Sequence, residues 1–522
     1  MKSSSTKFAC TLLTLTLVLS MVAGCGGKSA SKASEQPSAS SGATAAATGA
    51  TGVDVSKLKP YEIKWVMVGS GQPRDTARIE KLANDYLKDK INATIDLMVL
   101  DWGSWDAKTN AMFSTREKFD LIFSPSWWDH AGKARKGLYW PISEENLTQY
   151  APKTKALFKP DFWEASKVDG KLFAIPGNKD RAHARGIVYR KDIAEKLNLD
   201  MSAVKSWADM KPIYAKVKES GLIDGIGKQP PMYSGTFSKD KEPYEILSSG
   251  TLLAMPKDPN DNKIVSLFNE AYFDEYATMM RDYYDSGYTR KDALTSQDDQ
   301  INLGTVFSTE FQLKPGKADE LTQAMHQSGQ VAADAKYDQI YLTDSYVGND
   351  DVLGSSLAIS STSEDPERVL MFLELFYNDK YLNNLLVFGE ENVDYTKIDD
   401  NFIKLIPNAG YSQADVAWEY GNQYLNYLME GENPDKWKLF DEFNETAKPD
   451  KTLGFQFDSS PVKREIASVT NVYKNYEGFY WGTIDPKEKL AEFRSKLKAA
   501  GLDKVIAEAQ KQWDDYSAKK GK

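Results

Sequence analysis

The chain is long, acidic and poor in cysteine, and each property narrows what it can do. At 522 residues it exceeds the roughly 100–200 residues of one domain, so two or more lobes are expected. Its net charge of −10 argues against a nucleic-acid partner, whose binders present basic patches. Its two cysteines exclude a disulfide framework and leave little room for thiol redox chemistry.

The first 24 residues indicate a secreted protein with a lipid anchor. A basic head, "MKSSSTK", precedes the apolar core "FACTLLTLTLVLSMVAG", which is too short for a membrane span. Val22-Ala23-Gly24-Cys25 resembles the lipobox of bacterial lipoprotein precursors, which implies cleavage after residue 24 and acylation of Cys25; an ordinary secretory signal is the alternative. Cleavage removes Lys2 and Lys7 and no acid, so the net charge falls from −10 to −12. We expect a palmitate-type anchor on the extracellular side of the cell membrane, in a Gram-positive setting.

Residues 25–57 are small and polar, which predicts a flexible tether. Strands and helices then alternate: "YEIKWVMVG" and "NATIDLMVL" read as strands around the helical "TARIEKLANDYLKDKI", and "FDLIFS" reads as a third strand after a turn and helix. This alternation predicts an α/β fold with a largely parallel sheet, whose ligands sit beyond the carboxyl ends of the strands. No later apolar stretch approaches the roughly 20 residues of a transmembrane helix.

Three loops follow these strands, at residues 69–75, 101–106 and 124–130. A tryptophan face suits the apolar C–H face of a sugar ring, and a carboxylate accepts from its hydroxyls. The alternative for each aromatic residue is packing in the core. The sequence does not decide which of the two adjacent tryptophans, 127 and 128, faces a ligand. The ligand-binding candidates on these loops are Gln72, Trp102, Trp105, Trp127, Trp128 and Asp129.

Three further segments carry a resemblance to a known family. They are "DGKLFAIPGNKDRAHARGIVYRKDIAEKLNLD", "LGSSLAISSTSEDPERVLMFLELFYNDKYLNNLLVFG" and "GFQFDSSPVKREIASVTNVYKNYEGFYWGTIDPKEKL". In order and spacing they resemble extracellular solute-binding lipoproteins of ABC importers, of the maltose type, in a subgroup with a distinctive C-terminal region. One departure is Gly389-Glu390-Glu391-Asn392, where relatives read "G-I-E-G", which leaves the conformation of that loop open.

The resemblance implies a two-lobed periplasmic-binding-protein fold of type II, closing on ligand like a flytrap. We expect lobe one in residues 58–178 and 350–400, and lobe two in 179–349 and 401–522, with a helical C-terminal tail on lobe two. On the crossing segments and later loops the ligand-binding candidates are Asp180, His183, Arg185, Trp418, Asn422 and Asp458. An interlobe ion pair is the alternative for the first three, and a buried aromatic cluster is the alternative for Trp418.

Other chemistries find little support, so we expect no catalytic residue, cofactor or metal ligand. The three histidines, His130, His183 and His326, lack metal-ligand spacing, and His130 is interpreted as a surface residue. The stretch from Asp258 resembles a calcium loop, but Lys263 and Asn269 occupy positions that need glycine and glutamate. A glycoside hydrolase and a transporter-independent polysaccharide binder remain as weaker alternatives.

The resemblance therefore implies a monomeric, lipid-anchored substrate-binding component that captures a sugar or oligosaccharide and delivers it to membrane permease subunits. A peptide or another non-sugar solute is the alternative ligand. Nothing in the residues decides the ligand's length, stereochemistry or charge.

Overall fold

A computed structural model describes residues 53–223, 225–228, 244–248, 250–295, 301–327 and 329–520. The signal, Cys25 and nearly all of the tether lie outside these residues, so lipidation stays a prediction. Within the described part of the chain, no helix is long and apolar enough to cross a membrane.

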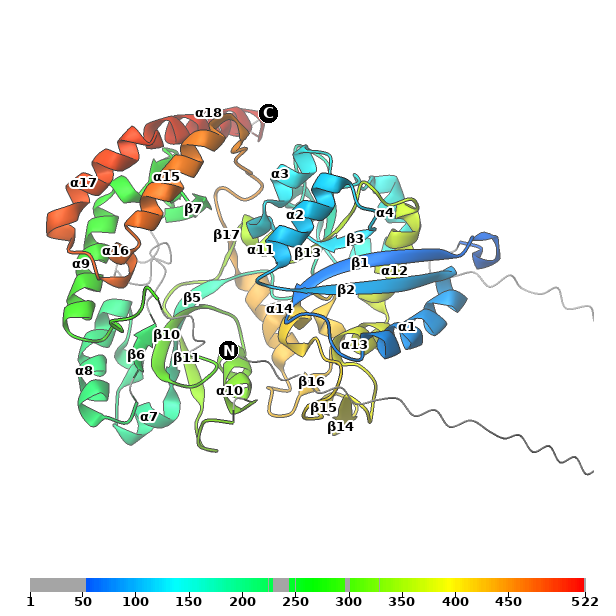
Figure 1. The fold of residues 1–522 in the computed structure, drawn as a ribbon, viewed down its shortest axis with the longest axis horizontal. Helices are drawn as coiled ribbons and strands as arrows, with labels where there is room; N and C mark the ends of the chain where they lie inside the picture. Colours follow the sequence, from blue (N-terminus) through cyan, green and yellow to red (C-terminus); the bar gives the residue numbers. More distant parts are fainter. Residues whose placement is uncertain are drawn as a thin grey trace, which may run out of the picture. The chain divides into compact units, whose positions relative to one another are not determined.

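The first lobe is built on a five-stranded sheet in the order β2-β1-β3-β13-β4 (Figure 1). β1 pairs in parallel with both β2 and β3, as predicted, whereas the returning β13 is antiparallel to β3 and β4. The strands are β1 (Tyr61–Gly69), β2 (Ala93–Asp101), β3 (Leu121–Phe123), β4 (Ala174–Pro176) and β13 (Ser356–Ile359).

Helix α1 (Thr76–Ile91) buries one face because its apolar residues recur at helical spacing, whereas α12 (Pro366–Asn378) is buried on all sides along residues 368–377. In α1 the residues Ile79, Ala83, Leu87 and Ile91 fall every four positions and are fully buried. The remaining helices of this lobe are α2 (Trp105–Thr115), α3 (His130–Arg135), α4 (Glu144–Tyr150), α5 (Pro152–Ala156), α6 (Pro160–Ala165) and α13 (Lys380–Phe388).

The second lobe has its own sheet, in the order β11-β5-β10-β6, with β5 antiparallel to both neighbours. Its strands are β5 (Ala184–Arg190), β6 (Gly225–Lys228), β10 (Val306–Leu313) and β11 (Tyr337–Tyr341), and a smaller sheet holds β7 (Tyr244–Ser248), β8 (Leu253–Pro256) and β9 (Val265–Ser266). Its helices are α7 (Lys191–Lys196), α8 (Met210–Ser220), α9 (Ala271–Asp285) and α10 (Lys317–Gln327).

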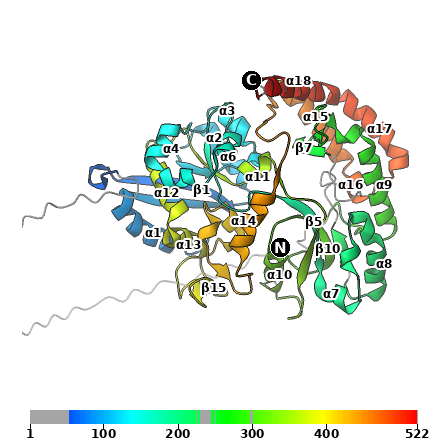
Figure 2. The same ribbon diagram turned by 180° about the vertical axis from the view of Figure 1, so that it is seen from behind.

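The C-terminal helices pack on the second lobe, as predicted. Figures 1 and 2 both place α15, α16 and α17 beside α9, and Phe479 and Phe493 share a buried cluster with Phe273 of that helix. These helices are α15 (Lys463–Asn475), α16 (Gly478–Trp481), α17 (Pro486–Ala499) and α18 (Leu502–Lys520). The preceding helix, α14 (Lys436–Thr446), instead packs its Phe440 against Tyr424.

Residues 401–429 pack with the first lobe, although the sequence analysis places them in the second. Ile403, Val416 and Tyr420 belong to the first hydrophobic core, and strands β14 (Tyr395–Lys397), β15 (Phe402–Leu405) and β16 (Leu428–Met429) form one small sheet. We therefore place the last passage between lobes after residue 429 rather than at 400.

The segments that connect the lobes pair with one another. The backbone of His183 bridges Tyr346, and β12 (Tyr346–Val347) pairs in parallel with β17 (Lys448–Pro449), just before α11 (Asn349–Leu353). Three stretches of chain, near residues 177–183, 342–355 and 430–452, thus form the connection.

The loop that departs from the family pattern is tied to the first lobe. Gly389 has φ of +88°, and a side chain there would clash with Asp394. Arg78 of α1 donates to the carboxylates of both Glu390 and Asp394, which holds the loop against that helix.

Candidate functional site

Two exposed tryptophans form one surface at the carboxyl ends of β2 and β3. Trp102 is 47% exposed and Trp127 is 49% exposed, and their rings lie 6.2 Å apart at 35°. Trp102 directly follows β2, and Trp127 lies in a 3-10 turn (Ser126–Trp128) after β3. Because β2 and β3 both run parallel to β1, which lies between them, their carboxyl ends lie at the same edge of the sheet, and residues from different parts of the chain meet here.

Trp127 is held in place by one hydrogen bond and one ring contact, while about half of its surface stays exposed. Its Nε1 donates to the Gly354 carbonyl at 2.9 Å, and its ring packs 6.0 Å from that of Phe123. Phe123 in turn meets the half-buried Trp418 at 5.7 Å, edge to face. We call Trp102, Trp127 and Trp418 the aromatic wall; Phe123, against which the last two pack, is fully buried.

A carboxylate borders the aromatic wall. Ser126 donates to Asp350 of α11 at 2.7 Å, and the Asp350 residue is exposed. Partial desolvation by the surrounding protein nevertheless raises the pKa of Asp350 above its usual range. The wall thus combines aromatic faces with a hydrogen-bond acceptor, and sequence reasoning missed Asp350 because no motif marks it.

Trp105 and Trp128, both predicted ligand contacts, are buried in the core of the first lobe. They are 2% and 8% exposed, their rings lie 4.7 Å apart, and Trp128 Nε1 donates to Asp106 at 2.7 Å. Lys133 Nζ lies 3.5 Å from the centre of the Trp128 ring and donates to the Trp128 carbonyl, and burial lowers the pKa of Lys133 to about 8. These two tryptophans therefore belong to the core, the alternative given for each aromatic residue, and not to the exposed surface.

Two other predicted contacts on the strand-end loops have local partners. The Gln72 side chain donates to the Leu97 carbonyl at 2.8 Å and accepts from the Val99 amide at 2.6 Å, so it completes the hydrogen bonding of strand β2. Asp129 adopts the left-handed backbone conformation, and its exposed carboxylate pairs with Lys136 at 3.6 Å. Gln72 is therefore reassigned to structural support.

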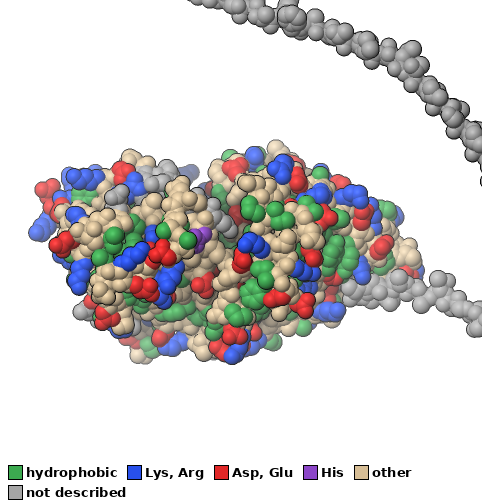
Figure 3. Space-filling view, turned by 90° about the horizontal axis from the view of Figure 1, so that it is seen from below, with side chains coloured by type: hydrophobic (Ala, Val, Ile, Leu, Met, Phe, Trp, Pro, Cys, Tyr) green, Lys and Arg blue, Asp and Glu red, His purple; other side chains and the backbone are tan. Residues whose placement is uncertain are grey.

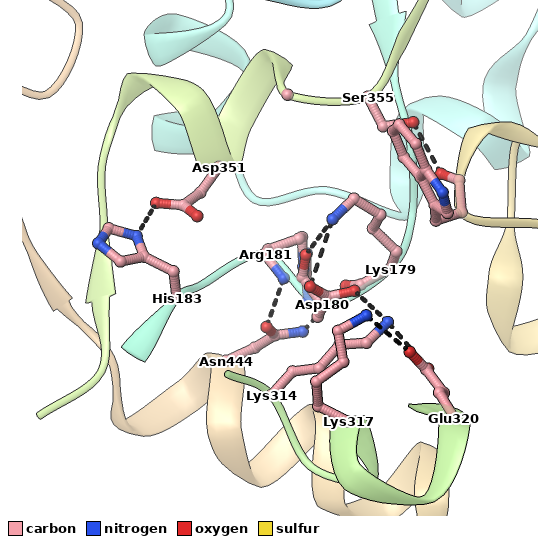
Figure 4. Close-up of polar contacts among 12 residues, drawn as sticks. Lys179, Asp180, Arg181, His183, Lys314, Lys317, Glu320, Asp351, Ser355 and Asn444 are labelled. Carbon is pink, nitrogen blue, oxygen red and sulfur yellow. Dashed lines mark hydrogen bonds and ion pairs between the residues drawn. The ribbon is translucent and has the colours of Figure 1, made fainter. Parts of the chain in front are cut away.

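The crossing-segment candidates contact acidic side chains, and the pair formed by Arg185 lies within the second lobe rather than between lobes. His183 Nδ1 lies 2.7 Å from the Asp351 carboxylate, and Figure 4 shows this pair beside the connection between lobes. Arg185 lies 3.7 Å from Glu310. Residues 181, 183 and 185 are partly exposed and alternate with buried neighbours, as expected where one face of a strand is covered.

Asp180 belongs to a buried charge network. It is 6% exposed and lies 3.4 Å from Lys314, which also contacts Glu320 at 3.2 Å. Figure 4 shows Lys314 and Lys317 both directed at Glu320. Burial alone would raise the pKa of Glu320, but Lys314, Lys317 and Lys436 outweigh it and hold that pKa well below its usual range.

The remaining candidates lie apart from the exposed tryptophans. Asn422 is buried, donates to the Tyr377 carbonyl at 2.8 Å and accepts from Asn178 at 2.9 Å. It does not share a helical face with Trp418, because a 3-10 helix (Ala414–Glu419) ends between them. Asp458 caps Ser460 at 3.0 Å in the C-terminal region. Both residues have structural roles here.

His130 is buried, which corrects its interpretation as a surface residue. It is 1% exposed, stacks on Tyr139 at 5.3 Å and contacts Ser124 Oγ at 2.9 Å, and burial lowers its pKa to about 3. Ser124 is fully buried as well, so this serine–histidine contact is closed to a substrate. Within the described ranges, no group of three or more histidine, cysteine or acidic side chains is placed to hold a metal ion.

Glu419, next to Trp418, is a buried carboxyl that sequence reasoning missed. It is 1% exposed, and neither oxygen has a hydrogen-bond partner among the described residues. Burial, and then the nearby Asp415, raise the pKa of Glu419 far above its usual range. A carboxyl in such surroundings is held in its neutral form.

We expect Glu419→Gln to stabilise the protein at pH 8 and to have little effect at pH 5. A carboxyl whose folded-state pKa is raised stabilises the fold below its unfolded pKa, and this contribution is lost as pH rises. An amide does not ionise, so Glu419→Gln avoids that loss of stability, which we place at about 1–3 kcal/mol. The free energy of unfolding at both pH values checks this, with Glu430→Gln, whose carboxylate is exposed, as the control. An unchanged pH dependence in Glu419→Gln would contradict the expectation.

Charge on the surface is mixed. In Figure 3, acidic and basic side chains are interspersed over the face shown, so that face carries no broad basic field suited to a polyanion.

Comparisons with known proteins place this geometry in context. Residues 70–382 match the family model described as bacterial extracellular solute-binding protein, and residues 451–518 match a domain of unknown function. A curated protein of Streptococcus pneumoniae, named carbohydrate ABC transporter substrate-binding protein, is 24% identical over 87% of this chain and 90% of its own length.

Solved structures share the fold. The N-glycan transport solute binding protein NgtS of Streptococcus pneumoniae is 22% identical with a TM-score of 0.76, over 88% of this chain and 99% of its own. The same protein in complex with Man5GlcNAc gives a TM-score of 0.70, over 88% and 98%. The alginate-binding protein AlgQ2 without calcium ion is 17% identical with a TM-score of 0.59, over 90% and 99%. These likenesses confirm the predicted two-lobed α/β fold.

Proposed function

The chain belongs to the family of bacterial extracellular solute-binding proteins, and from this premise we propose that its solute is a carbohydrate, most simply an oligosaccharide. The observation that carries the proposal is the pair of exposed tryptophans, Trp102 and Trp127, on adjacent strand-end loops. Indole faces cover the apolar face of a sugar ring, and Asp350 supplies an acceptor for hydroxyls beside them. The similar proteins named above as carbohydrate or N-glycan binders support the same class of ligand.

The proposed mechanism is capture without turnover. The ligand stacks on the aromatic wall of lobe one and is enclosed by lobe two, so it stabilises the closed arrangement by its differential affinity for that arrangement. A micromolar dissociation constant needs about 8 kcal/mol, which stacking on aromatic rings and a few charge-assisted hydrogen bonds supply after ordering costs. The similar proteins are named as binding proteins, which supports a non-enzymatic role.

The anchor and the transporter complete the proposal. A lipid on Cys25 would hold a monomer at the extracellular face of the membrane, and the linker up to about residue 57 would let it reach permease subunits of an ABC importer. His183 and Asp180 would then act in the connection between lobes, and Arg185 within the second-lobe sheet, rather than as ligand contacts.

A ligand screen tests the proposal directly. We expect the mature protein to gain thermal stability with at least one oligosaccharide from a panel of neutral, branched and acidic saccharides, because a ligand that binds the folded state raises Tm. Short peptides serve as the control panel, and chromatography of the recovered saccharide tests for cleavage. A shift with a peptide and none with any saccharide would overturn the carbohydrate assignment, and cleavage products would overturn the binding role.

A further inference from the structure

Three backbone carbonyl oxygens in one loop of the second lobe converge on a single ammonium group. The loop joins β8 to β9, and Lys451 Nζ lies 2.6 Å from the Pro256 oxygen, 2.9 Å from the Asp258 oxygen and 2.7 Å from the Asp261 oxygen. An ammonium has three hydrogens, so each carbonyl receives one. Charge-assisted hydrogen bonds of this kind are about twice as strong as neutral ones.

The backbone of the same residue is bound from the opposite side by a carboxylate. Glu245 of β7, 5% exposed, accepts from the Lys451 amide at 2.7 Å and from the Thr452 amide at 3.0 Å. The small β7-β8-β9 sheet therefore binds residues 451–452 in two ways: its β8–β9 loop accepts from the Lys451 ammonium, and its Glu245 carboxylate accepts from the backbone amides.

The loop is the stretch whose sequence resembles a calcium loop. Its carboxylates shape the backbone: Asp258 accepts from the Asn260 amide at 2.9 Å, and Asp261 accepts from the Lys263 amide at 3.0 Å. Three of its backbone carbonyl oxygens face the Lys451 ammonium group. Oxygen distances of 2.6–2.9 Å suit a monovalent cation held by carbonyls, whereas calcium takes six to eight oxygens at about 2.3–2.6 Å.

We propose that Pro256–Asp261 is a cation-binding loop, matched to a monovalent cation the size of ammonium or potassium, and that Lys451 is the cation the chain supplies to it. Lys451 is also the first residue matched by the second family model, so the loop holds the start of the C-terminal helical region. Removing the lysine side chain should convert this internal contact into a site for a free cation.

The test is thermal unfolding of Lys451→Ala, with Lys448→Ala as the matched control. Lys448 lies three residues earlier and pairs with the exposed Asp344. Replacing Lys448 therefore removes the same charge but leaves the contacts of the Pro256–Asp261 loop unchanged. We expect Lys451→Ala to lower Tm by roughly 3 °C or more and Lys448→Ala to change it little. Ammonium or potassium chloride should then restore Tm in Lys451→Ala alone, in a saturable way, relative to tetramethylammonium chloride at equal ionic strength.

The outcomes separate clearly. Equal salt responses in all three proteins, or rescue by calcium and not by ammonium or potassium, would overturn the proposal. If Lys451→Ala fails to fold, acylation of lysines in the wild-type protein, followed by mass spectrometry, gives the answer. Lys451 should then react at least tenfold more slowly than Lys448, and equal rates would overturn the proposal.

Discussion

Replacing Trp127 by alanine is expected to weaken carbohydrate binding by about 10- to 100-fold while leaving the protein nearly as stable as before. An exposed aromatic anchor at the centre of a binding surface contributes a large part of the affinity, and a tenfold loss corresponds to about 1.4 kcal/mol. Because half of Trp127 faces solvent, the truncation leaves no large internal cavity. Trp102→Ala should have an effect of the same direction. Calorimetric titration of the ligand found in the screen, together with Tm, measures both quantities.

Two control variants make this expectation specific. Tyr381→Ala removes an aromatic side chain that is 51% exposed on α13, against Tyr86 of α1, and should leave ligand affinity unchanged. Trp128→Ala removes a buried ring and should lower Tm strongly, because buried Trp→Ala changes cost about 3–5 kcal/mol. If Trp127→Ala and Trp102→Ala both bind ligand as tightly as the wild type, the aromatic wall is not the binding surface.

Glu320→Gln is expected to lower the free energy of unfolding by about 3 kcal/mol at pH 7. The carboxylate is the common partner of three ammonium groups, on Lys314, Lys317 and Lys436, and two of these are nearly buried. Among the described residues, removing this carboxylate leaves only Asp180 beside Lys314 and Glu432 beside Lys436, so buried positive charge is less well compensated. Denaturant unfolding of the wild type and the variant measures the difference.

The pH dependence gives a second measurement on Glu320. Its folded-state pKa is depressed, so its stabilising contribution is present above the unfolded pKa and is lost as pH falls. The stability gap between wild type and Glu320→Gln should therefore narrow below pH 4. Glu442→Gln is the control, because Glu442 pairs with Lys438 on the exposed face of α14 and should cost at most about 0.5 kcal/mol. A similarly small loss of unfolding free energy in Glu320→Gln and Glu442→Gln would show that the buried charge network stabilises the protein no more than an exposed ion pair does.

The sequence predicted the architecture well because periodicity reports on burial. The alternation of strands and helices from Tyr61 to Phe123 predicted three parallel strands, and the structure has them in that arrangement. The aromatic loops were also found, because they follow the strands directly. What one sequence could not decide is the direction in which each ring points.

Trp127 and Trp128 illustrate the limit. They are adjacent, of one residue type and in one turn, and only the 3-10 conformation of Ser126–Trp128 sends one outward and one into the core. His130 was misplaced for a similar reason, since an Asp-His pair after two tryptophans gives no sign that Tyr139 and Ser124 enclose the ring. The predicted boundary at residue 400 lies too early because residues 401–429 stay in the first lobe, through packing that has no local sequence signature.

The place of β13 in the first sheet has a consequence for how the chain folds. This strand lies between β3 and β4, although about 180 residues of the second lobe separate it from β4 in the chain. The edges of β3 and β4 stay unpaired until residues 356–359 arrive, so the first lobe cannot finish folding before the second has been made. Pairing between segments so far apart in the chain slows folding, and the unpaired edges of β3 and β4 stay exposed until β13 is in place. Any truncation before residue 356 should therefore yield aggregation rather than an isolated first lobe.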